Sequence, residues 1–308
     1  MKQTTLANKV SCSGIGLHTG RVVKITLYPA EPNTGVVFKR LDVEHEKSLV
    51  PARYDAVCET RLGTTIRNRS GVTVSTIEHL MAALWGAGVD NVLVELDGSE
   101  VPIMDGSSEP FTFMIECARV VQQNATRRIL RVLKTVEVHE GKSTARVQPN
   151  REGDEGCVLG VEIEFDNSVI SRQVLQYDFR DVTFKQTLSR ARTFGFEHEV
   201  EAMRANGLAL GGSLDNAIVV GKEKILNEEG LRYVDEFVRH KALDCLGDLF
   251  LAGSRIDGRF DFSRPGHGIN NALLRALFAD KTAYAITSAD AMPVPLLARP
   301  VKDAVAYA

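Results

Sequence analysis

The sequence predicts an α+β fold arranged in two domains. A chain of 308 residues is long enough for two domains that each bury a core. In each half, strand-like segments come before helical segments, which favours layered α+β architecture over strict strand–helix alternation. A polar, aperiodic segment at residues 122–128 separates the halves. We therefore place an N-terminal domain at residues 1–124 and a C-terminal domain at residues 129–308.

The first half contains two segments rich in β-branched and alternating apolar residues and two segments with helical spacing. The predicted strands are Val22–Tyr28 and Asn91–Leu96, and the predicted helices are Ser75–Trp85 and Ser108–Val121. The glycines of Gly14–Gly20 do not follow the Gly-x-Gly-x-x-Gly spacing of a phosphate-binding loop, because Thr19 takes the third position. We interpret this segment as a turn between strands.

The second half repeats the order of strands before helices. The predicted strands are Ile129–Val138, Ala145–Gln148 and Val158–Phe165, and the predicted helices are Glu197–Asn206, Leu231–Ala252 and Asn271–Ala279. Residues 150–156 are polar and glycine-containing, which predicts a surface loop.

Composition excludes several classes of protein. Hydrophobic residues make up 44% and charged residues 25%, as in ordinary globular proteins. The net charge of −3 gives no electrostatic basis for binding nucleic acid. No apolar segment approaches the roughly 18 residues of a membrane span, and the N-terminus lacks a signal peptide. Five scattered cysteines without a Cys-x-x-Cys pair indicate reduced thiols. We expect a cytoplasmic monomer.

Three side chains form a candidate metal site. His240 and Asp244 are four residues apart in a predicted helix, so both face the same side. His79 lies on a predicted helix of the other half. Two histidines and one aspartate are typical of catalytic zinc, which keeps a fourth position open. The alternative for His240 and Asp244 is an ordinary surface pair.

Glu78 directly precedes His79 and could take a proton from water at such a metal. It also has a structural interpretation, because Ser75-Thr76-Ile77-Glu78 matches a helix capping box. The two interpretations are compatible, since a cap can hold a carboxylate near a metal.

Two further segments have the character of site loops. The segment 263–271 places His267 between glycines just before a predicted helix, or is a turn with an exposed histidine. The segment 189–196 joins hydroxyl, cationic and aromatic side chains, or is simply the end of a strand. The remaining histidines, His18, His45, His139 and His198, have no ligand-like context.

Taken together, these segments resemble the zinc-dependent UDP-3-O-(3-hydroxyacyl)-N-acetylglucosamine deacetylases of lipid A synthesis. The matches run in family order over nearly the whole chain. They are Ser13–Gly20, Ser75–Leu80, Pro102–Gly106, Arg192–Gly195, Gly211–Ser213, Asp235–Lys241 with Asp244, Gly247–Asp248, and Gly266–His267 with Asn270–Asn271. One departure is Gly63, where some members have a cysteine near the site.

The resemblance implies a metal centre and a base. It implies that His79, His240 and Asp244 hold one zinc ion, with ferrous iron as the cellular alternative, and that Glu78 is the general base. The implied reaction is hydrolysis of the N-acetyl group of an acylated UDP-glucosamine, which releases acetate in the committed step of lipid A synthesis.

The resemblance also implies roles for five more residues. His267 matches a protonated histidine that stabilises charge or acts as an acid, and Asp248 matches the carboxylate that orients it. Thr193 matches a hydroxyl that holds the oxyanion. Lys241 and Phe194 match residues that contact the substrate.

The family fold implies two α+β domains of similar topology, each with a sheet layered with helices. Their helix layers pack together with the site between them. An insert near residues 196–221 would form an apolar passage for the acyl chain. Its apolar residues, which fit such a lining or plain packing, are Met203, Leu208, Leu210 and Leu214.

Two other functions stay open at this point. One is a zinc amidase that acts on a different acylated sugar or on a peptide. The other is a non-catalytic carrier or sensor of glycolipid nucleotides, which would need no base beside the metal. The chain ends soon after its last predicted helix, so we expect no fused second enzyme. Its small, apolar end, Asp303–Ala308, is either a handle for a regulatory protease or a frayed terminus.

Overall fold

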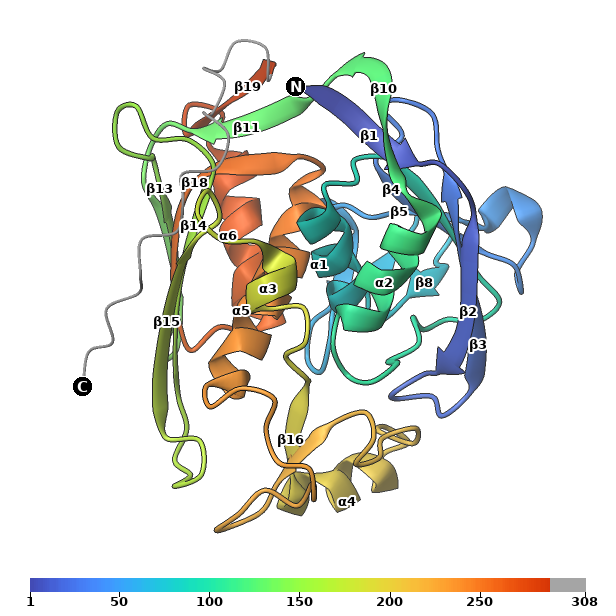
Figure 1. Cartoon of the computed structure of the whole chain (residues 1–308), viewed down its shortest axis with the longest axis vertical. Helices are drawn as coiled ribbons and strands as arrows, with labels where there is room; N and C mark the ends of the chain where they lie inside the picture. The colour runs from blue at the N-terminus through green and yellow to red at the C-terminus, as the bar shows by residue number, and fades with distance from the viewer. Residues whose placement is uncertain (289–308) are drawn as a thin grey trace.

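The computed structural model describes residues 1–288 and has the predicted α+β architecture. Two large sheets lie on opposite sides of the molecule, and the principal helices lie between them (Figure 1). The C-terminal segment Asp303–Ala308 lies outside the described residues. Within residues 1–288, none of the helices combines the length and apolar character needed to cross a membrane.

The first large sheet has five strands in the order β2-β3-β9-β4-β5. Alternate residues of β3 and β9 are buried, as expected for strands with one face on a core. A ribbon (β1 with β10) and a three-stranded sheet (β6-β7-β8) flank it. The strands of this half are β1 (Lys2–Leu6), β2 (Val10–Ile15), β3 (Val22–Pro29), β4 (Val36–Arg40), β5 (Leu49–Pro51), β6 (Val57–Glu59), β7 (Thr65–Arg67), β8 (Thr73–Val74), β9 (Val92–Leu96) and β10 (Val120–Thr126).

The second large sheet has seven strands, with the path β12-β13-β18-β11-β19 and with β14 pairing both β18 and β15. Strand β18 lies at its centre, and its alternate apolar residues are buried. The strands are β11 (Arg128–Val132), β12 (Val136–Glu140), β13 (Ser143–Gln148), β14 (Cys157–Glu164), β15 (Arg172–Asp178), β18 (Arg255–Ser263) and β19 (Tyr284–Ser288).

The helices are α1 (Glu78–Ala87), α2 (Glu109–Ala118), α3 (Phe184–Thr187), α4 (Glu197–Ala205), α5 (Glu236–Leu249) and α6 (His267–Ala279), with short 3-10 turns η1 (His45–Lys47), η2 (Tyr54–Ala56) and η3 (Phe250–Ala252). Helix α1 packs against α5 across the two halves. Eight of its residues, from Glu78 to Trp85, are buried. Such burial on every side is characteristic of a helix inside a larger core.

The predicted insert forms a small lobe at one end of the molecule (Figure 1). It contains α4 between β16 (Phe194–Phe196) and β17 (Ile218–Val220), which pair in parallel. The lobe contacts the first half, because the Gly211 amide donates to the Leu17 carbonyl at 3.0 Å.

Three predicted helix boundaries were wrong. The helix expected from Leu231 begins only at Glu236, and Val234, which lies within the predicted range, is 94% exposed. The helix expected from Asn271 already begins at His267. The helix expected to reach Val121 ends at Ala118, because Arg119 adopts a positive φ of 61° and the chain continues as β10.

The capping box was also wrong. Helix α1 begins at Glu78, and no side chain caps its N-terminus. Ser75 instead extends towards Ser99, to which its amide donates at 2.9 Å. Thr76 has a positive φ of 56°, a strained conformation for a β-branched residue. The Thr76 hydroxyl donates to the buried carboxylate of Glu100 at 3.1 Å, which helps to hold this turn.

The segment 122–128 is not an irregular linker. Most of it belongs to β10, which pairs antiparallel with β1, and β11 begins at Arg128. The Ile129–Val138 segment correspondingly divides into β11 and β12. Polar residues suit an exposed two-stranded ribbon, whose stability comes from backbone pairing that sequence periodicity does not reveal. The division into domains at residues 124–129 stays a prediction.

Candidate active site

Four elements converge on one cavity between the two halves. Helix α1 begins with Glu78 and His79, and α5 carries His240, Asp244 and Asp248 at four-residue spacing on one face. His267 is the first residue of α6. Thr193 immediately precedes β16, and Phe194 begins it. The cavity has a volume of about 560 Å³. Eight of the nine predicted residues line it: Glu78, His79, Thr193, Phe194, His240, Lys241, Asp244 and His267.

Gly247 allows α1 and α5 to approach closely enough to form this site. A Cβ atom at position 247 would lie 2.1 Å from the Glu78 carbonyl oxygen. That oxygen belongs to the backbone and cannot move aside as a flexible side chain would. The glycine therefore sets the distance between the helix that carries Glu78 and His79 and the helix that carries His240 and Asp244.

His79, His240 and Asp244 form a compact, buried cluster. One potential ligand atom from each lies within 4.8 Å of the others. Asp244 Oδ1 is 3.4 Å from His240 Nε2 and 3.7 Å from His79 Nε2. The two imidazole rings are nearly perpendicular, with their centroids 4.9 Å apart. All three residues are at most 4% exposed, so an ordinary surface pair of His240 and Asp244 is excluded.

The protonation of the cluster leaves lone pairs available for a cation. The Ala191 carbonyl lies 3.1 Å from His240 Nδ1, which favours the tautomer with the proton on Nδ1 and a free lone pair on Nε2. Burial, reinforced by His240, lowers the pKa of His79 to about 3, and burial also lowers the pKa of His240. Both imidazoles are therefore neutral near pH 7.

Asp244 is held as a carboxylate. Burial alone would raise its pKa, but His240 and Lys241 outweigh burial and bring the pKa below its usual range. Lys241 Nζ donates to Asp244 Oδ2 at 2.8 Å, while Oδ1 faces the imidazoles. Asp244 Oδ1 and His79 Nδ1 are buried and have no hydrogen-bond partner among the described residues. Because unpaired buried polar atoms are costly, this donor set fits a bound cation.

An acid–base pair lies beside the cluster. Glu78 Oε1 is 3.9 Å from His267 Nε2, and His267 Nδ1 is 2.8 Å from Asp248 Oδ2. Burial raises the pKa of Glu78 to about 7. Burial would lower the pKa of His267, but Asp248 and Glu78 outweigh it and raise that pKa to about 9. The pair thus joins a proton acceptor to a histidine that is charged at neutral pH, and an exposed histidine on a turn is excluded.

Gly63 leaves room beside Glu78. A Cβ atom at this position would lie 2.9 Å from Glu78 Oε1, so any side chain would crowd that oxygen. The sequence pattern identified Gly63 but missed its neighbour Thr64, which contacts both Glu78 and Asp248. It also missed Arg61 and Phe165 in the wall of the cavity. These three residues lie outside any motif, so only the folded chain identifies them.

The insert contributes less to the cavity than its apolar content suggested. Phe196 and Glu199 line the cavity, whereas Met203, Leu208, Leu210 and Leu214 do not. Leu210 and Leu214 are 53% and 44% exposed. The acyl passage through this lobe stays a prediction.

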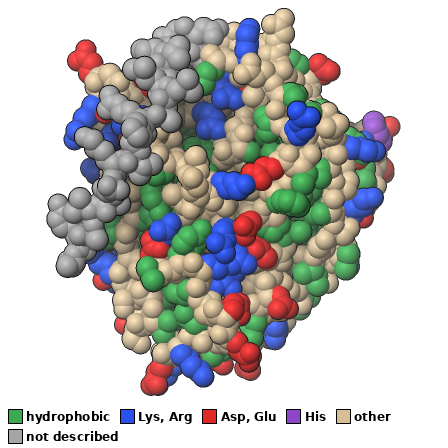
Figure 2. All heavy atoms as spheres, viewed as in Figure 1, with side chains coloured by type: hydrophobic (Ala, Val, Ile, Leu, Met, Phe, Trp, Pro, Cys, Tyr) green, Lys and Arg blue, Asp and Glu red, His purple; other side chains and the backbone are tan. Residues whose placement is uncertain are grey.

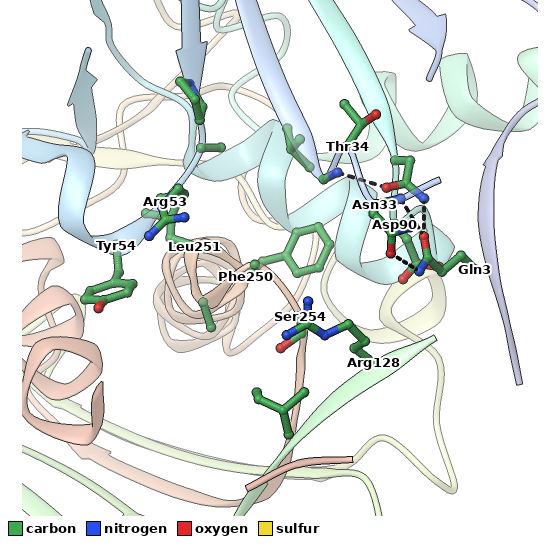
Figure 3. Close-up of a pocket in the computed structure, with 18 of the residues that line it drawn as sticks. Gln3, Asn33, Thr34, Arg53, Tyr54, Asp90, Arg128, Phe250, Leu251 and Ser254 are labelled. Atoms are coloured by element: carbon green, nitrogen blue, oxygen red, sulfur yellow. Dashed lines mark hydrogen bonds between the residues drawn. The ribbon is translucent and has the colours of Figure 1, made fainter. Parts of the chain in front are cut away.

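A second cavity of about 490 Å³ lies between the halves near η3 and β19. Figure 3 shows Phe250, Ser254 and Arg128 on one side of it and the hydrogen-bonded side chains of Gln3 and Asn33 on another. It contains none of the predicted site residues. On the face seen in Figure 2, acidic and basic side chains are interspersed, without a field of a single sign.

Comparison with known proteins identifies close relatives. Residues 3–279 match the family model for UDP-3-O-acyl N-acetylglycosamine deacetylase. A protein of Stenotrophomonas maltophilia (strain K279a) is 47% identical over 299 residues, which is 96% of each chain. One of Neisseria meningitidis serogroup C (strain 053442) is 48% identical over 290 residues, or 92% of each chain. One of Neisseria gonorrhoeae (strain ATCC 700825 / FA 1090) is 47% identical over 287 residues, again 92% of each. All three are named UDP-3-O-acyl-N-acetylglucosamine deacetylase.

Proposed function

The chain belongs to the UDP-3-O-acyl N-acetylglycosamine deacetylase family, and we propose that the cavity between its halves carries out this deacetylation. The reaction is hydrolysis of the N-acetyl group of UDP-3-O-(3-hydroxyacyl)-N-acetylglucosamine, the committed step of lipid A biosynthesis. Water adds its oxygen to the acetyl carbon, the C–N bond breaks, and acetate and a free amine leave. The observation that carries this proposal is the buried His79, His240 and Asp244 cluster next to the Glu78–His267 pair.

We propose zinc as the resident ion, with ferrous iron as the alternative. Two neutral imidazoles and one carboxylate are a typical protein donor set for catalytic zinc. The unpartnered Asp244 Oδ1 and the neutral His79 and His240 support it. A divalent ion at such a site supplies Lewis acidity and lowers the pKa of water from 15.7 to about 7.

The two ends of the acid–base pair have opposite tasks in this proposal. Glu78 Oε1 takes the proton of the attacking water, because Oε2 is already occupied by the Thr64 amide at 3.0 Å. The charged His267 donates its Nε2 proton to the leaving amine, and Asp248 keeps that imidazole oriented and charged. The proton gained at Glu78 and the proton lost at His267 balance over the reaction.

Three pocket residues act directly on the substrate in this proposal. The Thr193 hydroxyl makes no hydrogen bond to residues 1–288, so it is free to donate to the oxyanion. One such donor typically contributes about 3 kcal/mol to transition-state stabilisation. The Lys241 ammonium and the Phe194 ring also line the cavity, where they contact the sugar nucleotide.

The proposed function is tested by measuring metal content together with acetate release, before and after chelation. We expect activity on the 3-O-acylated nucleotide that is lost with the metal and restored by added Zn²⁺. UDP-N-acetylglucosamine without the acyl chain is the matched control and should react far more slowly. Equal rates on both nucleotides would favour a different zinc amidase, and metal binding without acetate release in a single turnover would favour a carrier.

A further inference from the structure

Thr64 connects Glu78 to Asp248, the hydrogen-bond partner of His267. It lies directly before β7 and is 1% exposed. Its amide donates to Glu78 Oε2 at 3.0 Å, and its hydroxyl donates to Asp248 Oδ1 at 2.5 Å. Its carbonyl accepts from the amide of Ile77 at 3.4 Å. Every polar group of this residue is therefore used, and each bond leads to an element of the active site.

The amide bond determines which oxygen of Glu78 faces the cavity. With Oε2 held by Thr64, Oε1 is the oxygen that faces His267 Nε2 at 3.9 Å. The glycine before Thr64 keeps the space around Oε1 open, because a Cβ at position 63 would come within 2.9 Å of it. Gly63 thus leaves space around Glu78 Oε1, and Thr64 holds Oε2 in a hydrogen bond.

The hydroxyl bond fixes the rotation of the Asp248 carboxylate. Asp248 is 2% exposed, and its Oδ2 accepts both from His267 Nδ1 and from Asn270 Nδ2 at 2.8 Å. Among residues 1–288, Thr64 is the only hydrogen-bond donor to Oδ1. A carboxylate with both oxygens engaged cannot rotate about its Cβ–Cγ bond without breaking a buried hydrogen bond.

We propose that Thr64 is a positioning residue that couples the base to the acid: its amide orients Glu78, and its hydroxyl orients Asp248 and, through Asp248, His267. This inference rests on the roles proposed above for Glu78 and His267. Thr64 itself does not line the cavity, and its hydrogen bonds to residues 1–288 lead to Glu78, Asp248 and Ile77 and not to the His79, His240 and Asp244 cluster. Outer partners of this kind typically change activity by about tenfold to a hundredfold when they are lost.

A set of substitutions separates the hydroxyl from the shape of the side chain. Thr64→Val keeps the shape and loses the hydroxyl, Thr64→Ser keeps the hydroxyl and loses the methyl group, and Thr64→Ala loses both. If the hydroxyl positions Asp248, kcat falls about tenfold to a hundredfold in the Val and Ala variants and is largely rescued in the Ser variant. KM and metal content should stay unchanged in all three. If Thr64 only fills space, the Val variant should have the kcat of the wild type, and the Ser and Ala variants should both have a lower kcat. This result would overturn the proposal.

Thr65→Val is the matched control. Thr65 is the next residue, and its hydroxyl makes no hydrogen bond to residues 1–288. We expect wild-type kcat from this variant. Should the Val and Ala variants fail to fold, the comparison passes to Thr64→Ser and Thr64→Cys, because a thiol of similar size is only a weak donor. Equal kcat in the Ser and Cys variants would then overturn the proposal.

A double-mutant cycle and a metal-free measurement complete the test. In an Asp248→Asn background, Thr64→Val should reduce kcat much less than in the wild type, whereas fully additive losses would contradict action through Asp248.

In metal-free protein labelled with ¹⁵N-histidine, Thr64→Val should shift or broaden the His267 Nδ1–H resonance. An unchanged resonance would also contradict the proposal. Glu78→Gln in the same assay tells the two proposals apart. Full activity in that variant would remove the role proposed for Glu78 as the base. Loss of its activity beside a fully active Thr64→Val would remove only the role of Thr64.

Discussion

Glu78 serves as the base in our proposal through a single oxygen. The other oxygen accepts a hydrogen bond from the Thr64 amide, and the residue as a whole is 3% exposed. Burial raises the pKa of this carboxylate, which makes it a better proton acceptor than an exposed glutamate. A nearby cation would lower this pKa again, so that the ionised form dominates at neutral pH.

We predict that Glu78→Gln keeps the bound metal but lowers kcat by at least about a hundredfold. Glutamine retains the shape and can still accept the Thr64 amide bond, but it cannot take a proton. Metal content and kcat should be measured on the same preparation. Near-full activity would return Glu78 to a purely structural role.

The pKa of His267 predicts the alkaline limit of activity. Asp248 and Glu78 raise this pKa above its ordinary value of 6.5 to about 9. Because the charged form is the acid in our proposal, activity should fall as the pH rises through about 9. The free energy of unfolding should change in the same direction. The stabilisation from the His267–Asp248 pair is fully present below the unfolded-state pKa of the histidine and is lost as the pH rises through about 9.

Asp248→Asn should move this alkaline limb to lower pH by about one to three units, since a neutral amide no longer favours the imidazolium. The measurement is the pH dependence of kcat/KM for the variant and the wild type. If the alkaline decrease in kcat/KM occurs at the same pH in the variant and the wild type, a group other than His267 causes it.

At the scale of elements, the crossing of α1 and α5 forms the site. Both helices bring residues of the His79, His240 and Asp244 cluster to this crossing, and Gly247 sets the separation between the helices. Thr76, just before α1, holds a strained backbone angle and bonds to Glu100, which also accepts from the His18 and Thr19 amides. The beginning of α1 is thus fixed by tertiary contacts in place of a local cap.

We predict that Gly247→Ala destabilises the protein by about 1 to 3 kcal/mol, because the new Cβ would collide with the backbone of α1. It should also weaken metal binding, since the two helices would be pushed apart. Gly195→Ala is the matched control for stability, because a Cβ there meets nothing within 4 Å. Urea unfolding of both variants measures the difference, and equal midpoints would contradict the close approach.

At the scale of the whole molecule, the two halves share one core. A single cluster of buried apolar residues includes Leu27 and Leu84 from the first half and Leu243 and Phe260 from the second. The candidate metal site is also shared, because His79 comes from one half and His240 with Asp244 from the other. Metal binding should therefore stabilise the folded chain as one unit.

We predict that saturating Zn²⁺ raises the free energy of unfolding by about 3 kcal/mol at a hundred times Kd, relative to the chelated protein. In calorimetry, the transition should move to higher temperature as a single peak. His240→Ala should abolish this shift, because it removes a ligand. A metal-dependent shift that persists in this variant would remove His240 from the ligand set.

The periodicity of the chain was enough to predict the α+β class, the longer central strands β3, β9, β13 and β14, and the existence of the principal helices. Alternating burial in β3 and β9 and the apolar content of α1 are direct consequences of residue order. Family motifs identified all nine predicted site residues, and the structure brings them together in and beside one cavity. Their individual roles stay proposals.

Tertiary structure decided the rest, for physical reasons that no local pattern contains. The ribbon of β1 and β10 depends on pairing between strands more than a hundred residues apart, and the beginning of α1 depends on a strained Thr76 held by Glu100. Thr64 belongs to no motif, since its importance lies in two hydrogen bonds to residues 14 and 184 positions away. Residue order determines which faces are apolar, whereas the contacts of buried polar groups are set only when distant segments pack together.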